Sequence, residues 1–564
     1  MSLISKRCLA LVTIVALGLI TAACAPSAKP PASEKAAPGE KVAQTDKAPK
    51  RGGTITFNYA SAWNADPAMG QTPYTTWYYA GDPMIYRDPE TFELKPSVFE
   101  SWKVSPDGKE ITLKVRQGMK FHNKPPINGR EVEAKDLVYV LKSATGLQYP
   151  DLPSVRFPRK QSFKGMVDAV AVDKYTVKVT LENPSVSFLH ALGDYRGTWV
   201  YPDGLREAFG GTDSLAQTDP KKDIGSGPFI LTKFTSAVEQ IFERNPSYWQ
   251  PGKPYLDRVR VLQIPDTSTQ QAAFVTGQMD TQSLSGAQAR DFILGARKDI
   301  QVIDYAPNSC WNRISLNTQR KPLDDYRVRR ALYLVVDKKA LGETLRGSTA
   351  DGKPLWKYPG PLPWVFTEAI PQEELAKHPL YLGPTPENVA EAKRLLKEAG
   401  YEGGFALEML GASSTVKEEG TLIHADITKY LPEVKLTLKP VDTEIHRARA
   451  AKGDYDAQLY CHIHDVTAVA HLAQAHHTLG GRNYGQYKDP ELDAILDEAD
   501  RTLDPAKYKV LVVKAQNYIL DKSLSMLPTL HSQAQIALQP DLRGMRFGAG
   551  NSNQVGAWDW WRDK

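Results

Sequence analysis

Cysteine is scarce in this chain, with 4 residues in 564. A disulfide-dense scaffold is therefore excluded, because such proteins depend on many closely spaced cysteines. Charge imbalance is also small: the formal net charge is +5, and no run of five or six basic residues occurs. This distribution argues against a nucleic-acid surface. After the first 23 residues no apolar stretch reaches 18 residues, so the rest of the sequence contains no candidate transmembrane helix.

The N-terminus has the pattern of an export signal. Lys6 and Arg7 precede a mostly apolar run over residues 8–20, and small residues then lead to Cys24. A basic start, a short apolar stretch and small residues before a cleavage site predict a secretory signal peptide, here residues 1–23. The residues before Cys24 resemble a bacterial lipobox, which predicts lipidation of Cys24 as the first residue of the mature chain. The alternative is ordinary cleavage without a lipid.

Residues 24–50 are predicted to be this lipidated cysteine and a flexible tether. The stretch is rich in Ala, Pro, Lys and Ser and contains no aromatic residue, so it cannot bury a core. Two cysteines remain in the body that follows, Cys310 and Cys461. They either form one disulfide or stay as two buried thiols.

The body from residue 51 mixes strand and helix signals without an internal repeat. Alternating patterns predict strands at 54–59 and 111–115, and a hairpin of 166–172 and 175–181 turning at Asp173 and Lys174. Helical periodicity with end signals predicts helices at 387–399 with Thr385 as N-cap, at 325–336 with Asp324 as N-cap, and at 490–503. Helices mixed with unevenly spaced strands favour α/β or α+β layers over a barrel or a bundle.

Four groups of motifs occur in the order typical of one family. They are Gly52-Gly53-Thr54 with Asp66-Pro67; Leu94-Lys95-Pro96, Glu100-Ser101-Trp102, Ser105-Pro106-Asp107-Gly108 and Arg116 to His122; Gly225-Ser226-Gly227-Pro228-Phe229 with Arg244 to Trp249; and Asn317 with Pro322 to Asp325 and Val328 to Leu332. On these motifs the body resembles the family 5 extracytoplasmic solute-binding proteins of ABC importers, which include dipeptide- and oligopeptide-binding proteins. The segment His122-Asn123-Lys124-Pro125 departs from the family pattern and is interpreted as a surface loop.

The resemblance implies an α/β fold of the two-lobed periplasmic-binding-protein type (class II), with an extra inserted domain and a hinged cleft. Domain I would comprise residues 51–92, 224–308 and 531–564. Domain II, residues 93–223, would be inserted within it. Domain III, residues 309–530, would close against domain I about a hinge near residues 223–227, 308–310 and 530–532.

Candidate ligand contacts follow from the resemblance and from the needs of a buried peptide. A buried ammonium group requires a carboxylate, and peptide binders of the family place an Asp after a strand of domain III. Asp465 is the candidate here, although it is equally interpreted as the N-cap of a helix starting near Val466. The other candidates are His462, His464, Trp63, Trp77, Trp311, Asn317 and Trp364.

The sequence therefore predicts the substrate-binding component of an ABC importer, which captures a short peptide and delivers it to the permease. A nickel complex, an oligosaccharide or an opine-like compound is the alternative ligand, and an enzyme or a chaperone is the alternative class. No catalytic residue, metal or cofactor is expected: Gly225-Ser226-Gly227 lacks the following Lys of a phosphate loop, and Asp465 follows His464 directly, one residue out of register with a metallohydrolase motif. We expect an extracytoplasmic, lipid-anchored monomer that binds no nucleic acid.

Overall fold

The structure is a computed structural model that describes residues 48–58, 78–152, 160–194, 199–211, 219–284, 286–305, 311–349, 351–412, 416–462, 465–548 and 556–564. The chain divides into two compact units, Met1–Lys41 and Val42–Lys564. The first unit lies outside the described residues, as do Cys24 and most of the predicted tether. Everything below concerns the second unit.

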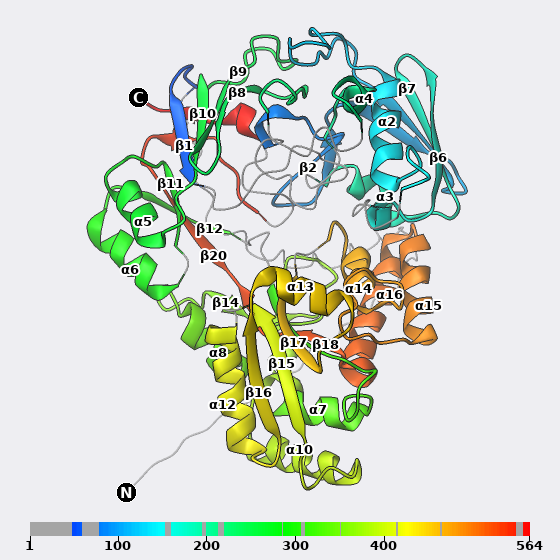
Figure 1. Cartoon of the computed structure of the whole chain (residues 1–564), viewed down its shortest axis with the longest axis vertical. Coiled ribbons are helices and arrows are strands. Elements are labelled where there is room, and N and C mark those ends of the chain that lie inside the picture. Colours follow the sequence, from blue (N-terminus) through cyan, green and yellow to red (C-terminus); the bar gives the residue numbers. More distant parts are fainter. Residues whose placement is uncertain are drawn as a thin grey trace, which may run out of the picture. The chain divides into compact units, whose positions relative to one another are not determined.

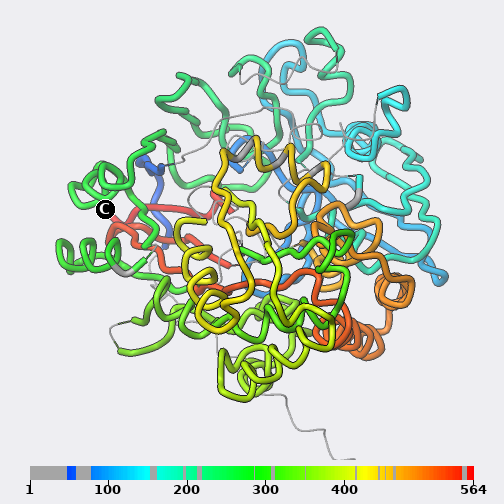
Figure 2. Tube along the Cα trace, turned by 60° about the horizontal axis from the view of Figure 1, so that its bottom comes forward, coloured from blue at the N-terminus to red at the C-terminus, as the bar shows by residue number. Residues whose placement is uncertain are grey.

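Two sheets combine strands from the beginning, the middle and the end of this unit (Figures 1 and 2). The first has the order β1-β10-β9-β8, from β1 (Thr54–Asn58), β10 (Arg258–Leu262), β9 (Glu239–Arg244) and β8 (Phe229–Thr235), with β1 and β10 parallel. In the second, β20 (Ala534–Leu538) lies between β11 (Thr281–Ser283) and β12 (Gln301–Tyr305), antiparallel to both. The helices α5 (Thr267–Val275) and α6 (Ala287–Ala296) flank β11 in the sequence.

The two ends of the described body are joined to each other. Lys50 donates a hydrogen bond from Nζ to the backbone oxygen of Lys564 at 2.8 Å. Arg562, in β22 (Trp561–Arg562), donates from Nε to the backbone oxygen of Thr54 in β1 at 2.7 Å and forms an ion pair with Asp280. β22 pairs in turn with β21 (Leu542–Arg543).

The segment predicted as domain II contains an antiparallel sheet in the order β4-β5-β7-β6. Its strands are β4 (Phe99–Val104), β5 (Glu110–Val115), β7 (Thr176–Leu181) and β6 (Met166–Asp173). The helix α2 (Ala134–Thr145) contacts β6 and β7 with a face rich in Leu and Val, and it ends at Gly146 in the left-handed conformation. The short elements here are β2 (Ile85–Arg87), β3 (Leu94–Pro96), α3 (Val186–Ala191) and α4 (Leu205–Ala208).

The segment after residue 311 forms a mixed sheet in the order β16-β15-β17-β13-β18, visible in yellow and green in Figure 1. Its strands are β13 (Trp311–Leu316), β15 (Ala406–Ala412), β16 (Lys435–Val441), β17 (Ala457–His462) and β18 (Met526–Pro528). The accompanying helices are α7 (Tyr326–Leu334), α8 (Lys338–Arg346), α9 (Gln372–Leu375), α10 (Pro386–Glu398), α12 (Thr421–Tyr430), α13 (Thr443–Ala451), α14 (Ala468–His476), α15 (Pro490–Arg501) and α16 (Pro505–Tyr518). β14 (Trp356–Lys357) pairs with β19 (His531–Ser532) in a separate two-stranded sheet. In the sequence, β19 lies between β18 of the mixed sheet and β20 of the second sheet described above.

Two large hydrophobic cores form in the described part of the chain. The first core draws buried side chains from Ile55 to Val261 and again from Ile536 to Trp560, so it spans the segments predicted as domains I and II together, and it also includes Val466 from the range predicted as domain III. The second core draws its members from Ile314 to Leu527, which lie within the range predicted as domain III. The division into three domains stays a prediction, because domains I and II share the first core.

The predicted helices and strands are present, but their ends differ from the predicted ones by one or a few residues. Thr385 caps α10 by accepting from the backbone of Asn388 at 3.2 Å, as predicted. The N-cap of α7 is Asp325, which accepts from the backbone of Arg327, so the choice of Asp324 is wrong by one residue. The hairpin of β6 and β7 turns at residues 174–175, one residue later than predicted, because β6 continues through Asp173.

The segment from His122 to Pro125 lies at the surface in part, as predicted, because Asn123 and Pro125 are exposed, but His122 and Lys124 make interior contacts that the prediction missed. His122 is buried, and its Nε2 lies 3.1 Å from the backbone oxygen of Gly227. Lys124 donates from Nζ to three backbone oxygens, those of Pro220, Asp223 and Leu231. These hydrogen bonds attach the segment to residues 220–231, where the chain leads into β8. The sequence pattern does not reveal these contacts.

The Gly225-Ser226-Gly227 turn directly precedes β8, as predicted. A Cβ atom on Gly225 would lie 2.0 Å from the backbone oxygen of Ala80. The backbone N–H of Gly227 donates to that same oxygen at 2.9 Å. Glycine is required here by close backbone approach, and the turn offers no open space for a phosphate group.

Candidate functional site

The ends of several strands meet at one edge of the sheet that contains β13. β16, β15, β17 and β18 run in the same direction, and β13 runs against them. Their carboxyl ends therefore share an edge with the amino end of β13, where Trp311 is paired with His462. In open α/β sheets, ligands bind outside the carboxyl ends of the strands. Asp465 follows β17 by three residues and lies next to this edge.

Residues 465–467 join the two hydrophobic cores. Val466 is 5% exposed and packs in the first core, whereas Ala468, two residues later, packs in the second. The hydroxyl group of Thr467 lies 2.8 Å from that of Ser187, in α3. We call residues 465–467 the seam. Asp465 is therefore placed where a solute held between the two cores would lie.

Asp465 does not cap the helix that follows it. The N-cap of α14 is Thr467, whose hydroxyl group accepts from the backbone N–H of Ala470 at 3.2 Å. The alternative interpretation of Asp465 is therefore wrong. Asp465 is 7% exposed. Its carboxylate forms an ion pair with Arg482, with 3.6 Å between Oδ2 and Nη1.

One face of the sheet near Asp465 is buried but polar. Arg313 on β13 and Gln458 on β17 are both 0% exposed. His446 from α13 stacks on Tyr460, the register partner of Arg313, with ring centroids 4.2 Å apart. From α14, His471 accepts a hydrogen bond at Nε2 from Nη2 of Arg313. A polar face enclosed by helices is unusual for a sheet, since buried polar groups are costly unless they are paired.

The electrostatics of this face are dominated by Arg313. Burial, followed by the neighbouring Arg482, lowers the pKa of Arg313 to about 9, so the guanidinium stays charged at neutral pH. Burial and the charge of Arg313 lower the pKa of His476 to about 3, so His476 is neutral. The face thus holds a buried cation next to the neutral imidazole group of His476.

A second contact links the two cores beside the seam. Asp500 at the end of α15 accepts from the hydroxyl groups of Ser185 at 2.9 Å and Ser187 at 2.6 Å, and from the backbone N–H of Ser187 at 3.3 Å. Lys164 lies 3.3 Å from Asp497, one turn earlier on the same helix. We call the contact between Asp500 and the two serines the clasp.

The other predicted site residues are distributed unevenly. Asn317 lies just after the opposite end of β13, where its amide donates to the backbone oxygens of Gly453 and Tyr455, so the structure does not bring it to the edge. Trp364 is half-buried in the loop after β14, with Lys357 5.7 Å from its ring. Trp63, Trp77 and His464 lie outside the described residues, and the side chains of Trp311 and His462 are not described.

A cavity of about 180 Å³ lies in the other part of the chain, at the ends of β1 and β12. Phe57 and Asn58 of β1, Tyr305 of β12 and Phe547 contribute to its lining, with polar groups from Gln270 and β11. Ligand pockets usually measure about 300–1,000 Å³. This cavity is therefore large enough for one side chain of a solute but not for a whole one.

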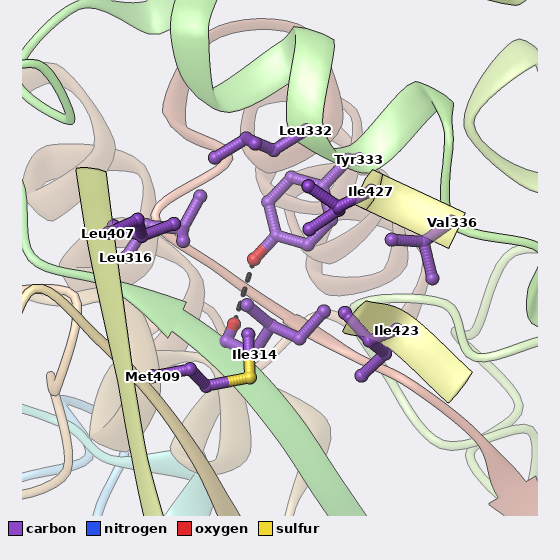
Figure 3. Close-up of a pocket in the computed structure, with 9 residues that line it drawn as sticks. All are labelled: Ile314, Leu316, Leu332, Tyr333, Val336, Leu407, Met409, Ile423 and Ile427. Carbon is purple, nitrogen blue, oxygen red and sulfur yellow. Dashed lines mark hydrogen bonds between the residues drawn. The ribbon is translucent and has the colours of Figure 1, made fainter. Parts of the chain in front are cut away.

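A smaller cavity, shown in Figure 3, lies within the second core. It measures about 10 Å³ and is lined by apolar side chains such as Ile314, Met409 and Ile423. The one polar group that points into this region, the Tyr333 hydroxyl, donates to the backbone oxygen of Ile314 at 2.8 Å. This space is a packing gap, not a binding site.

Sequence reasoning missed Arg313, Arg482 and the clasp. Arg313 stands in an alternating strand pattern, where an arginine is normally expected on a solvated face. The serines and Asp500 are more than 300 residues apart in sequence, so no local pattern joins them. Within the described residues no group of three or more His, Cys, Asp or Glu side chains is arranged to hold a metal ion. No described helix is both long and apolar enough to span a bilayer.

Comparisons with known proteins identify the family of this chain. The profile of the bacterial extracellular solute-binding proteins, family 5 (middle region), matches residues 93–469, more than half of the chain. Heme-binding protein A of Haemophilus influenzae is 25% identical over 570 residues, covering 95% of this chain and 96% of that protein. The glutathione-binding protein GsiB of Escherichia coli is 24% identical, covering 83% of this chain and 86% of that protein.

Solved structures share the fold. The dipeptide-binding protein of Pseudoalteromonas sp. SM9913, in complex with Met-Leu, superposes with a TM-score of 0.75 at 23% identity, covering 91% of this chain and all of that one. The two-lobed α/β fold expected from the sequence is thereby confirmed. Members of the matching family are extracytoplasmic binding proteins of ABC importers, and the chain belongs to this family, the family 5 extracellular solute-binding proteins of bacteria.

Proposed function

We propose that the protein captures a short peptide at the seam, between its two hydrophobic cores, and delivers it to the permease of an ABC importer. The seam is the observation that carries the proposal: Val466 packs in the first core while Ala468, directly after the seam, packs in the second, and the seam follows β17 at the strand edge where α/β proteins bind ligands. The relatives named for glutathione and for a dipeptide complex support a peptide.

Capture requires that the two cores separate and rejoin. Hinge closure around a ligand is an established kind of transition in binding proteins. Moving such an equilibrium from 1:99 to 99:1 takes about 5.5 kcal/mol of differential affinity. The clasp joins the two cores through hydrogen bonds between side chains, which suit an equilibrium that a solute can shift. ATP hydrolysis belongs to other subunits of the importer.

Native mass spectrometry of the purified protein tests the capture of a solute. We expect an additional mass that is lost on denaturation, together with compaction in small-angle scattering when the solute is returned. Glutathione, Met-Leu and trialanine are then titrated by calorimetry. If none of these probes binds and no solute is retained, the peptide proposal is refuted.

Asp465 is proposed to take part in binding. Asp465→Ala should weaken the binding of a peptide by about tenfold or more, because a charged hydrogen-bonding group at a buried site is removed. The melting temperature should change little, since the residue lies at the seam and not in either core. Equal affinity of the variant and the wild type would remove Asp465 from the site.

Heme is the second candidate solute. One relative, which matches over 95% of this chain, is named as a heme-binding protein. Hemin is therefore included in the titrations, with absorbance of the Soret band as a separate readout. Binding of hemin in preference to all peptides would replace the peptide proposal and leave the solute-binding role intact.

The lipid anchor at Cys24 and the monomeric state are proposed on the sequence pattern alone. Cys24→Ala should release the protein from the membrane fraction, and the wild-type N-terminus should carry acyl chains in mass spectrometry. Two or more acyl chains hold a protein stably at a membrane. A mature wild-type protein that begins with an unmodified residue would refute the anchor.

A further inference from the structure

His477 is a buried imidazole beside the clasp, close to the junction between the two cores. It ends α14 and is 6% exposed. Its Nδ1 accepts a hydrogen bond from the backbone N–H of Leu479 at 2.9 Å. Because Nδ1 is an acceptor, the neutral ring carries its proton on Nε2. No described residue accepts a hydrogen bond from that Nε2.

Charged groups face this ring from both cores. On α15, Oδ1 of Asp493 lies 3.7 Å from Nδ1 of His477, and Oδ1 of Asp497 lies 3.6 Å from its Nε2. Lys164 approaches from the other core, with its Nζ 3.3 Å from the same oxygen of Asp497. Arg501, also on α15, lies 3.7 Å from Oδ2 of Asp497. Asp497 is therefore shared between His477 of its own core and Lys164 of the other.

The groups around His477 respond differently to separation of the cores. Burial lowers the pKa of His477 from its ordinary value, and the charge of Lys164 adds to this effect, whereas the two carboxylates oppose it. α14 and α15 pack against each other, so Asp493 and Asp497 stay beside the ring when the cores separate. Lys164 follows Phe163, a member of the first core, and moves away.

A protonated His477 fits the joined arrangement poorly. Its Nδ1 then carries a hydrogen, which faces the N–H of Leu479 instead of accepting from it. The new positive charge also competes with Lys164 for the carboxylate of Asp497. Because separation removes Lys164 from the ring, the separated state binds the proton more tightly than the joined state. A proton that binds one state more tightly shifts the equilibrium toward that state.

We propose that His477 makes capture sensitive to acid: its protonation favours separation of the two cores and so releases the solute. The inference rests on the proposed solute-binding function and adds a regulation to it. The joined state has its full stability above the ordinary pKa of histidine, about 6.5, and loses stability as the pH falls below that value. A difference of one pKa unit between the two states changes their ratio by up to about tenfold.

Three variants separate the switch from a structural role. His477→Asn removes the titration and keeps a side-chain oxygen that can accept from the N–H of Leu479. Lys164→Met removes the cation that faces the ring from the other core, and Lys164→Arg retains it. Lys164 is half-exposed, so its replacement leaves both cores intact.

His378 provides a matched control. Its Nδ1 also accepts from the backbone N–H two residues later, that of Leu380, at 3.3 Å. Burial likewise lowers its pKa. The charged groups that face it all lie within the range of the second core: Arg330, Asp521 and Lys338. His378→Asn therefore removes a comparable imidazole without changing the junction.

Small-angle scattering of the purified protein tests the switch without a known solute. The wild type should expand between about pH 7.5 and about pH 5.5, and His378→Asn and Lys164→Arg should expand equally. His477→Asn and Lys164→Met should keep one radius of gyration over this range. A wild type of constant radius, or a His477→Asn variant that expands like the wild type, overturns the proposal.

Two carboxyl groups titrate in the same pH range. Burial raises the pKa of Asp82 to about 7 and that of Asp223 to about 6. Both are present in every variant, so the comparison of the variants with the wild type removes their contribution.

Calorimetry links the switch to binding, with glutathione and Met-Leu as probes. For a probe that binds, the Kd of the wild type should rise about tenfold from pH 7.5 to pH 5.5, and that of His477→Asn by less than about twofold. Equal rises in both proteins overturn the proposal and leave the solute-binding function intact. If neither probe binds at either pH, the peptide proposal fails, and the scattering measurements alone decide the switch.

Discussion

The clasp offers a direct test of whether the junction between the two cores controls binding. Asp500→Ala removes the acceptor of two short hydrogen bonds from Ser185 and Ser187, at 2.9 and 2.6 Å, and of a longer one from the Ser187 backbone. Hydrogen bonds to a charged group contribute about 1.5–3 kcal/mol each, and a half-buried site lowers this value. We therefore expect the joined state to lose about 2 kcal/mol in total.

A loss of this size has a measurable consequence for affinity. About 2 kcal/mol changes an equilibrium by roughly 30-fold. If binding requires the joined state, the apparent Kd of a bound solute rises by up to that factor, although Asp500 need not contact the solute. Calorimetry measures the Kd, and small-angle scattering measures the accompanying expansion of the protein.

Matched variants make the result interpretable. Asp521→Ala removes an exposed carboxylate from the short helix Ile519–Ser523, which follows α16, and should leave the Kd unchanged. Ser185→Ala should weaken binding in the wild type but have little further effect in Asp500→Ala, because the Ser185 hydroxyl group donates to Asp500 and the two side chains act as one unit. An unchanged Kd in Asp500→Ala, or additive effects of the two changes, would refute the reasoning.

Two further predictions concern the first core. Asp82 is fully buried and accepts from Ser226 and Tyr248, and burial raises its pKa to about 7. The folded state therefore holds a proton that the unfolded state releases from about pH 4, so stability should fall by up to about 4 kcal/mol as the pH rises from 4 to 7. Asp82→Asn should flatten this slope in urea titrations at pH 5 and 8, and an unchanged slope would contradict the assignment. A Cβ atom on Gly227 would lie 2.6 Å from backbone atoms of Ala80 and Gly81, so Gly227→Ala should cost about 3 kcal/mol or more. Gly403→Ala meets no atom within 4 Å and should be nearly neutral in the same thermal melts; equal melting of the two variants would show that the turn can relax.

Local rules explain why so much of the fold was predictable. Thr385, Pro386 and the glycine after α10 follow from the chemistry of helix ends, which acts within a few residues. The same holds for the turn at Gly108, whose backbone N–H donates to the oxygen of Ser105 at 2.9 Å. The family pattern supplied the long-range topology, which propensities alone do not contain.

The candidate site was predictable only in part, because its chemistry depends on distant residues. Asp465 was identified from its place after a strand, and the structure puts it at the expected strand edge. The ion pair with Arg482 and the exposed fraction of Arg313 depend on how α14 and the following loop pack, which no local pattern encodes. The burial of His122 escaped prediction for the same reason: its partner, Gly227, is 105 residues away.

The path of the chain through the first core bears on when the protein can fold. β20 fills the place between β11 and β12, and Arg562 ties β22 to β1. A nascent polypeptide thus lacks the central strand of that sheet until about residue 538 has left the ribosome. Contacts of such large sequence separation also form slowly. That sheet and the tie between β22 and β1 are therefore completed only after nearly the whole chain has been synthesised, whereas the strands of the sheets β4-β5-β7-β6 and β16-β15-β17-β13-β18 are all available earlier.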